Sequence, residues 1–452
     1  MREVAVDNGF FETESIWKIL MRIAPPVMLA QLIQALYNIV DSYFVGQYSG
    51  NGLTALSVIF PIQLIITALA VGTGVGVNTQ MAHLCAHNRN DDANRTAGTG
   101  MILALITWCV FAVVSLIIMK PYAKASVQST EAFEYAVTYG TIVCVGSLGI
   151  FLESIWTKVH QSRGNMRLPM IAQIAGAITN IVLDPILIFG WGPVPQMGVA
   201  GAAIATVIGQ LVAAVITGVT GIKKPPKLST MLQYIKPIYK LGCPSIFMQL
   251  LFTVYIVALN VILVGFSDAA VTVLGLYYKI QTFFFIPLMG LQTCIVPLLS
   301  YNHSRNNYVR CKEIMQDSVL IAMSFMLIGV LCFELIPDKL IRLFSNDVTV
   351  LQIGIIAFRI IGLSFLPAVL SLITPVFFQA IGASKPSMLL SLTRQILCLI
   401  PIFWLFSRIG LNYTWLAFPM AEVITGSLGA VLYFRQLRKW FRRHTFETDK
   451  FS

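Results

Sequence analysis

Residues 24–47 read APPVMLAQLIQALYNIVDSYFVGQ, and this stretch decides the fold. It is apolar over more than the roughly 20 residues that a helix needs to cross the hydrocarbon core of a membrane. Polar side chains within it are spaced i, i+3, i+4, i+7 and so lie on one helix face: Gln34, Tyr37, Asn38 and Asp41. The stretch therefore predicts a membrane-spanning helix with a polar face turned toward the inside of a bundle.

The composition extends this prediction to the whole chain. Of the 452 residues, 57% are hydrophobic and only 11% are charged, whereas a soluble domain carries roughly 25% charged residues. Apolar runs of about 20 residues also exclude an outer-membrane barrel, which shows shorter alternating segments. We expect an all-α integral membrane protein with twelve transmembrane helices, near 16–40, 53–79, 97–119, 135–157, 168–190, 198–221, 238–265, 271–300, 315–337, 351–378, 387–407 and 412–434.

Basic residues orient these spans. The formal net charge is +11, with 31 Lys and Arg residues, but only five of them fall in odd-numbered loops: Lys120, Lys124, Lys339, Arg342 and Arg408. Most of the others lie in even-numbered loops and at the termini, so the positive-inside rule places both termini in the cytoplasm. The basic residues are short clusters between apolar runs, which speaks against nucleic acid as a partner.

Several chemistries are not expected. The eight Cys are scattered without a CxxC pair, so neither a disulfide framework nor a zinc site is predicted. Gly72, Gly74 and Gly76 lie within an apolar run without a preceding strand or a GK[ST] sequence, which favours close helix packing over a nucleotide loop. We expect no enzyme activity and no cofactor, so an ion gradient must drive any active transport.

The chain contains an internal repeat with an offset close to 218 residues. Pro26 and Gln31 match Pro244 and Gln249, and Gln161 matches Gln379. We expect two pseudo-symmetric six-helix bundles in the same orientation, residues 1–222 and 238–452 with a basic cytoplasmic tail, joined by a cytoplasmic linker at 223–237. Such a body can rock its two bundles around a shared cavity.

Polar side chains inside the spans require an explanation, because a buried carboxylate costs at least roughly 2.5 kcal/mol on insertion scales. In the fifth span Asn180 and Asp184 lie one turn apart on one face. Asp41 facing Asp184 would suit uptake of a proton or coordination of Na⁺, since burial disfavours a charged carboxylate. The alternatives are an interfacial Asp41 and an Asp184 that marks the helix break at Pro185.

Other spans carry weaker signals. Glu153 and Thr157 share a face in the fourth span, although Glu153 could instead pair with Lys158. The second half has Gln249 and Asn260 on one face of its first span but no carboxylate there. Its deeper charges are Lys279, Arg359, Arg394 and Glu422, and Lys279 is a candidate for a cavity or gating role.

Four stretches resemble the multidrug and toxic compound extrusion (MATE) transporters, in particular the DinF and MepA-like branch. They are residues 24–47, TNIVLDPILIFGWG at 179–192, GVAGAAIATVIGQ at 198–210 and GLQTCIVPLLSYN at 290–302. The resemblance covers essentially the whole chain. It implies a secondary antiporter that exports lipophilic, mostly cationic drugs and dyes, including fluoroquinolones, in exchange for H⁺ or Na⁺.

The resemblance also implies roles for individual residues. It assigns ion coupling, and Na⁺ ligation if Na⁺ is the ion, to Asp41, Asn180 and Asp184. Tyr37, Tyr139 and Thr206 would lie close by, and Pro26 would lie at a bend in the first helix. The implied substrate cavity is lined by Gln34, Tyr37, Glu153, Thr157 and Asn180, with Gln249, Asn260 and Lys279 as candidates from the second half.

The sequence departs from the family in its second half. The NorM-like branch keeps carboxylates in its seventh and tenth spans, where this chain has Asn260 and Arg359. MepA-like members can carry a glutamate where this chain has Thr293. We therefore expect neither a cation site in the second half nor substrates that rely on that glutamate.

The prediction is thus a multidrug antiporter of the bacterial inner membrane, acting on small amphipathic cations among membrane lipids. A monomer is the expectation from the family. Two alternatives stay open: a flippase for lipid-linked saccharides with related architecture, and a passive channel or non-transporting receptor.

Overall fold

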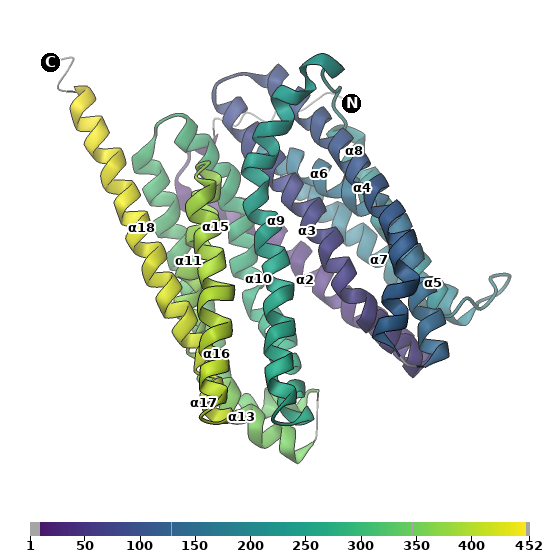
Figure 1. The fold of residues 1–452 in the computed structure, drawn as a ribbon. Coiled ribbons are helices and arrows are strands. Elements are labelled where there is room, and N and C mark those ends of the chain that lie inside the picture. The colour runs from purple at the N-terminus through teal and green to yellow at the C-terminus, as the bar shows by residue number, and fades with distance from the viewer. Residues whose placement is uncertain (1–9, 128, 345–346, 449–452) are drawn as a thin grey trace. The chain divides into compact units, whose positions relative to one another are not determined.

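The computed structural model describes residues 10–127, 129–344 and 347–448, and they contain helices but no strand (Figure 1). The first half contains α1 (Phe10–Thr13), α2 (Ile16–Tyr48), α3 (Gly50–Ala86), α4 (Asn90–Ser126), α5 (Thr130–Gly146), α6 (Leu148–Ser162), α7 (Arg167–Phe189) and α8 (Val199–Gly221). The second half contains α9 (Leu228–Val264), α10 (Asp268–Ser304), α11 (Tyr308–Leu335), α12 (Pro337–Arg342), α13 (Val348–Gly362), α14 (Phe365–Ala380), α15 (Ser384–Leu392), the π-helix η1 (Thr393–Leu399), α16 (Ile400–Ser407), α17 (Leu411–Thr414) and α18 (Ala417–Thr448).

The helices confirm the predicted membrane architecture. Within the described residues, eleven helices are long and apolar enough to span a membrane, and the pair α13 and α14, bent by 54°, brings the number to twelve. Several helices run past the predicted span ends, as α3 does from Gly50 to Ala86. The protein is therefore a multi-pass membrane protein.

The chain forms two compact units. The first, here called the N-lobe, comprises residues 25–249 of the described chain; the second, the C-lobe, comprises residues 10–24 and 250–448. The chain passes from one lobe to the other inside α2, next to Pro25, and inside α9, after Gln249. Of the predicted linker at 223–237, only residues 223–227 are non-helical, because α9 begins at Leu228.

Small residues let the N-lobe helices approach closely. A Cβ atom on Gly176 of α7 would lie 2.6 Å from the carbonyl oxygen of Gly209 on α8. On α6, Trp156 packs against α8: an added Cβ on Gly218 would lie 2.8 Å from the indole, and one on Gly221 would lie 2.8 Å from the Trp156 Cβ atom. Helix contacts of this kind are typical of membrane bundles, in which lipid provides little apolar driving force between helices.

Aromatic packing holds the C-lobe together. Phe333 stacks on Phe358 with ring centroids 4.9 Å apart and lies 4.7 Å from the ring of Phe365. The residues before α2 are held to this lobe by hydrogen bonds from side chains of the lobe to their backbone. Arg310 Nε donates to the carbonyl oxygen of Phe11 at 2.9 Å, and Asn302 Nδ2 donates to the same oxygen at 3.2 Å.

Candidate functional site

The N-lobe buries a polar cluster contributed by α2, α7 and α8. Asp184 is 0% exposed and Asp41 8%, while Asn180 and Thr206 are also buried. Asn180 Nδ2 donates to Asp184 Oδ1 at 3.3 Å and to Thr206 Oγ1 at 3.4 Å. Asp41 interacts electrostatically with Asp184. The structure thus brings together the four residues Asp41, Asn180, Asp184 and Thr206, which we call the acidic cluster.

Local sequence explains this arrangement. Asn180 and Asp184 are one turn apart on α7, so both side chains lie on one face. The close approach at Gly176 and Gly209 brings that face of α7 onto α8, and an added Cβ on Gly209 would lie 3.2 Å from the Asn180 Cβ atom. Helix α7 continues through Pro185 to Phe189, so Asp184 does not mark a helix break.

Three oxygens of the acidic cluster have no hydrogen-bond donor among the residues that the structure describes. They are Asp41 Oδ1, Asn180 Oδ1 and Asp184 Oδ2, and all three are buried. Buried polar atoms are nearly always partnered, so such a group requires an explanation. Two carboxylates, an amide oxygen and a hydroxyl form a donor set that fits a proton or a hard cation such as Na⁺.

Tyrosines adjoin the cluster. Tyr37 lies one turn before Asp41, interacts with both carboxylates and hydrogen-bonds Gln34. Tyr139 is buried on α5, and its hydroxyl accepts a hydrogen bond from Gln63 Nε2 on α3 at 3.3 Å. Sequence reasoning missed Gln63, although a glutamine inside the apolar run at 53–79 was a usable signal.

Glu153 belongs to a second polar group of the N-lobe. Its Oε1 accepts a hydrogen bond from Thr157 Oγ1 at 2.6 Å, and Gln173 on α7 is a further partner. Lys158 donates to Gln161 Oε1 at 2.8 Å. His160 Nε2 donates to the Thr217 carbonyl oxygen at 3.0 Å and so connects α6 with α8.

The predicted cavity residues of the second half are more dispersed. Gln249 is the last residue of the N-lobe, whereas Asn260 and Lys279 belong to the C-lobe. Lys279 and Arg359 are exposed in the structure. The placement of Gln249, Asn260 and Lys279 in a substrate cavity, with Gln34, stays a prediction.

The C-lobe holds a buried ion pair that sequence reasoning did not predict. Arg394 of η1 donates from Nε to both Glu422 carboxylate oxygens at 3.0 Å, and its Nη2 lies 2.5 Å from Oε1. The hydroxyl of Ser371 on α14 also donates to Glu422. Both charged residues stood out in the sequence, but nothing in the spacing of 28 residues revealed that they pair.

The MatE family model matches the chain twice, over residues 26–186 and 244–405. The chain belongs to the MatE family. Asp41, Asn180 and Asp184 lie within the first matched segment and Arg394 within the second, while Thr206 and Glu422 follow the segments.

Relatives of this MatE protein are named as transporters. It is 24% identical to the multidrug export protein MepA of Staphylococcus saprophyticus, with 95% of this chain and 96% of the relative covered. It is also 24% identical to the probable multidrug resistance protein NorM of Thermotoga maritima, with 96% of this chain and 95% of the relative covered. A FAD transporter of Shewanella oneidensis is 24% identical, with 91% and 93% covered.

Solved structures share the MatE fold. One is an outward-facing multidrug resistance MATE family transporter of the MOP superfamily, with a TM-score of 0.90, 22% identity and 96% and 99% of the two chains covered. Another is a MOP superfamily transporter from Pyrococcus furiosus, with a TM-score of 0.89, 22% identity and coverage of 97% and 99%.

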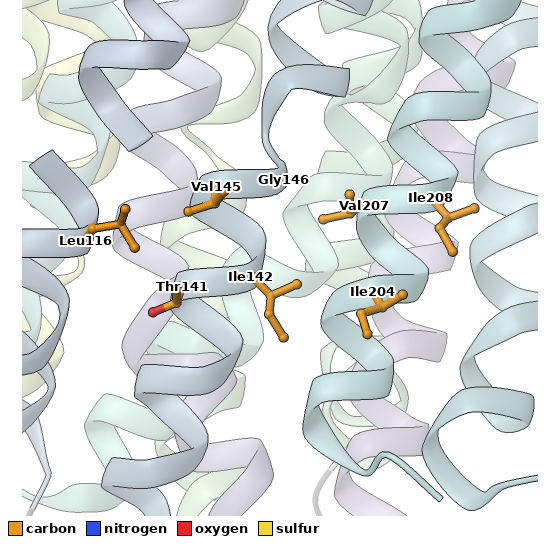
Figure 2. Close-up of a pocket in the computed structure, with 8 residues that line it drawn as sticks. All are labelled: Leu116, Thr141, Ile142, Val145, Gly146, Ile204, Val207 and Ile208. Atoms are coloured by element: carbon orange, nitrogen blue, oxygen red, sulfur yellow. The ribbon is translucent and has the colours of Figure 1, made fainter. Parts of the chain in front are cut away.

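An apolar groove of about 530 Å³ lies in the N-lobe of this MatE protein (Figure 2). Its lining comes from α4, α5 and α8: Leu116, Thr141, Ile142, Val145, Gly146, Ile204, Val207 and Ile208. Thr141 is the one polar side chain among them. None of the predicted site residues lines this groove, which offers no charged group to orient a cation.

Proposed function

We propose that this protein exports lipophilic, mostly cationic drugs and dyes in exchange for H⁺ or Na⁺, with Asp41 and Asp184 as the coupling residues. The observation that supports this most is the set of three buried oxygens without a donor in the acidic cluster. Two carboxylates with no cationic partner are costly in a medium of low dielectric constant. Uptake of a proton or Na⁺ relieves that cost.

The position of Asp41 on α2 supports a link between ion uptake and movement. Pro25 and Pro26 lie inside the same helix, and proline removes a backbone hydrogen bond and weakens a helix at that point. When H⁺ or Na⁺ binds and the charge at Asp41 changes, the contacts of α2 change, and this helix can bend at Pro26. The bundles then rock between inward-open and outward-open states.

Substrate selection is assigned to polar groups outside the acidic cluster. Glu153 supplies a carboxylate for a cationic substrate, and Thr157 holds that carboxylate in place. Gln34 and Tyr37 extend the polar surface on α2, and Gln249, Asn260 and Lys279 are the proposed contribution of the second half. The substrate enters from the cytoplasm or inner leaflet of a bacterial inner membrane, in which a monomer lies among lipids with both termini cytoplasmic.

The test uses purified protein in liposomes with the dye cation rhodamine 123. A pH gradient and a Na⁺ gradient are imposed separately on wild type, Asp41→Asn and Asp184→Asn, with Asp91→Asn as a control at an exposed position. Dye movement driven by one ion and lost in both site variants supports the proposal and names the ion. Dye that equilibrates without any gradient indicates a channel, and failure of both gradients directs the next test to lipid-linked saccharides.

A further inference from the structure

The Arg394–Glu422 pair lies deep in the C-lobe, where charge is costly. The side chains are only 12% and 8% exposed. Arg394 lies near the middle of the span Ser384–Ser407, and Glu422 lies in the span that contains α18. Ionisable groups at such positions are rare and are by default candidates for function. The π-helix that carries Arg394 supports this reading, because π-helical turns occur frequently at functional sites.

The internal repeat relates this cluster to the N-lobe. The two MatE segments begin 218 residues apart, and the same offset superposes Tyr37 on Tyr255 and Glu153 on Ser371. After the segments, the sequence Ala-Thr-Val-Ile at 205–208 corresponds to Ala-Glu-Val-Ile at 421–424. Glu422 is therefore the repeat counterpart of Thr206, a member of the acidic cluster.

The remaining counterparts show what has changed between the lobes. At the 218-residue offset the counterpart of Asp41 is Leu259, and at the 219-residue offset of Val45-Gly46 and Val264-Gly265 it is Asn260. Neither alignment places a carboxylate there. Pro185 corresponds to Pro401, which places Ile400 at the position of Asp184. The C-lobe thus lacks counterparts of both carboxylates of the acidic cluster, and it has the carboxylate of Glu422 where the cluster has Thr206.

Arg394 provides the cation that this carboxylate requires. At the offset that pairs Pro185 with Pro401, Arg394 corresponds to Ile178 of α7, so its guanidinium has no charged counterpart in the N-lobe. Two nitrogens contact the carboxylate, and Ser371 donates a further hydrogen bond. The titratable groups that face the pair from neighbouring helices are Tyr255 on α9 and Tyr277 and Tyr278 on α10.

We propose that Glu422 forms a second cation site, related by the repeat to the acidic cluster, and that the guanidinium of Arg394 permanently occupies it. The tethered cation neutralises Glu422 and prevents H⁺ or Na⁺ from binding there. This inference rests on the proposed function in assigning the exchangeable ion to the N-lobe. Removal of Arg394 should therefore create a site for a small monovalent cation at Glu422.

The experiment measures thermal stability rather than transport, so that it does not depend on the outcome of the transport assay. The substitutions Asp41→Asn and Asp184→Asn are made first, so that the acidic cluster has no carboxylate that could bind H⁺ or Na⁺. In this background the Tm is compared in NaCl, ethylguanidinium chloride and choline chloride, and between acidic and neutral pH. The Tm of Arg394→Gln should be about 2 °C or more higher in Na⁺ or ethylguanidinium than in choline, and higher at acidic than at neutral pH by a similar amount. Arg394-containing protein and Arg394→Gln/Glu422→Gln should show none.

Two further variants keep the inference falsifiable. Arg394→Lys retains a tethered cation, and a Na⁺ response in it equal to that of Arg394→Gln would overturn the proposal. If Arg394→Gln does not fold, Arg394→Gln/Glu422→Gln should fold, because it leaves no unpaired charge. Failure of both to fold, or an Arg394→Gln protein insensitive to every cation and to pH, would contradict the tethered-cation site.

Discussion

Thr206 offers a substitution that removes one hydrogen-bond acceptor from the acidic cluster and leaves nearly the same shape. Its Oγ1 accepts a hydrogen bond from Asn180 Nδ2, and a typical hydrogen bond contributes about 0.5–1.5 kcal/mol net. We expect Thr206→Val to raise the concentration of the coupling ion needed for half-maximal transport by about 2–10-fold, without loss of folded protein. The measurement is dye export at varied ion concentration.

Thr217 provides the matched control on the same helix. Its hydroxyl donates to the carbonyl oxygens of Ala213 and Ala214 in α8 itself, so Thr217→Val removes an intrahelical hydrogen bond only. An equal change of ion dependence in both variants would show that Thr206 acts through α8 stability and not through the cluster.

Substitution of Asp184 tests whether the buried carboxylates of the acidic cluster destabilise the fold. Its Oδ2 is buried without a donor, and replacing an unpaired buried carboxylate removes a destabilising charge. We expect Asp184→Asn to have a Tm equal to or above that of wild type at neutral pH in buffer without Na⁺. A Tm lower by several degrees would mean that the carboxylate stabilises the fold, and its proposed role in coupling would lose its main physical support.

At the scale of single residues, some members of the acidic cluster could be predicted to lie together and others could not. Asn180 and Asp184 follow from helix periodicity, because residues four apart share a face. Tyr139 and Thr206 required the resemblance to the family, since each is one polar residue in an apolar helix. The contact of Arg394 with Glu422 joins two helices, and a contact between helices has no periodic signal in one sequence.

The packing of α7 on α8 determines whether the acidic cluster can form. Because a Cβ atom on Gly209 would lie 2.7 Å from the Gly176 carbonyl oxygen, Gly209→Ala should force the helices apart. Overpacking of this kind costs about 1–3 kcal/mol. We expect a lower Tm and weaker ion dependence of transport.

Gly275 is the matched control for this substitution. It is also helical, but nothing lies within 4 Å of an added Cβ, so Gly275→Ala should leave the Tm unchanged or raise it slightly. Equal melting temperatures for Gly209→Ala and wild type would contradict the close helix approach.

Helix boundaries were less predictable than helix existence. The predicted span 135–157 contains the junction between α5 and α6 at Ser147, and the span 351–378 contains the break between α13 and α14. Neither break is marked by a proline at the junction itself. An apolar run fixes how much chain lies in the membrane, whereas the place of a bend depends on packing against neighbouring helices.

At the scale of the whole molecule, topology is the prediction that rests on charge alone. The loop residues 222–227 between α8 and α9 contain three lysines, whereas residues 190–198 between α7 and α8 contain no Lys or Arg. The positive-inside rule places the first loop in the cytoplasm and the second outside. In a cysteine-free background, Val194→Cys should react with an impermeant maleimide in intact spheroplasts, and Lys224→Cys should react only after lysis. The reverse pattern would invert the topology.

The central claim is that Asp41 and Asp184 couple an ion gradient to export, and one comparison tests it most directly. Proteoliposomes containing wild type or Asp41→Asn are assayed for exchange of rhodamine 123 across the membrane at equal concentrations, and for uphill dye transport driven by the coupling ion. The account predicts that Asp41→Asn retains exchange and loses uphill transport, because the substrate path remains while the coupling charge is gone. Uphill transport by Asp41→Asn at the wild-type level would contradict the account.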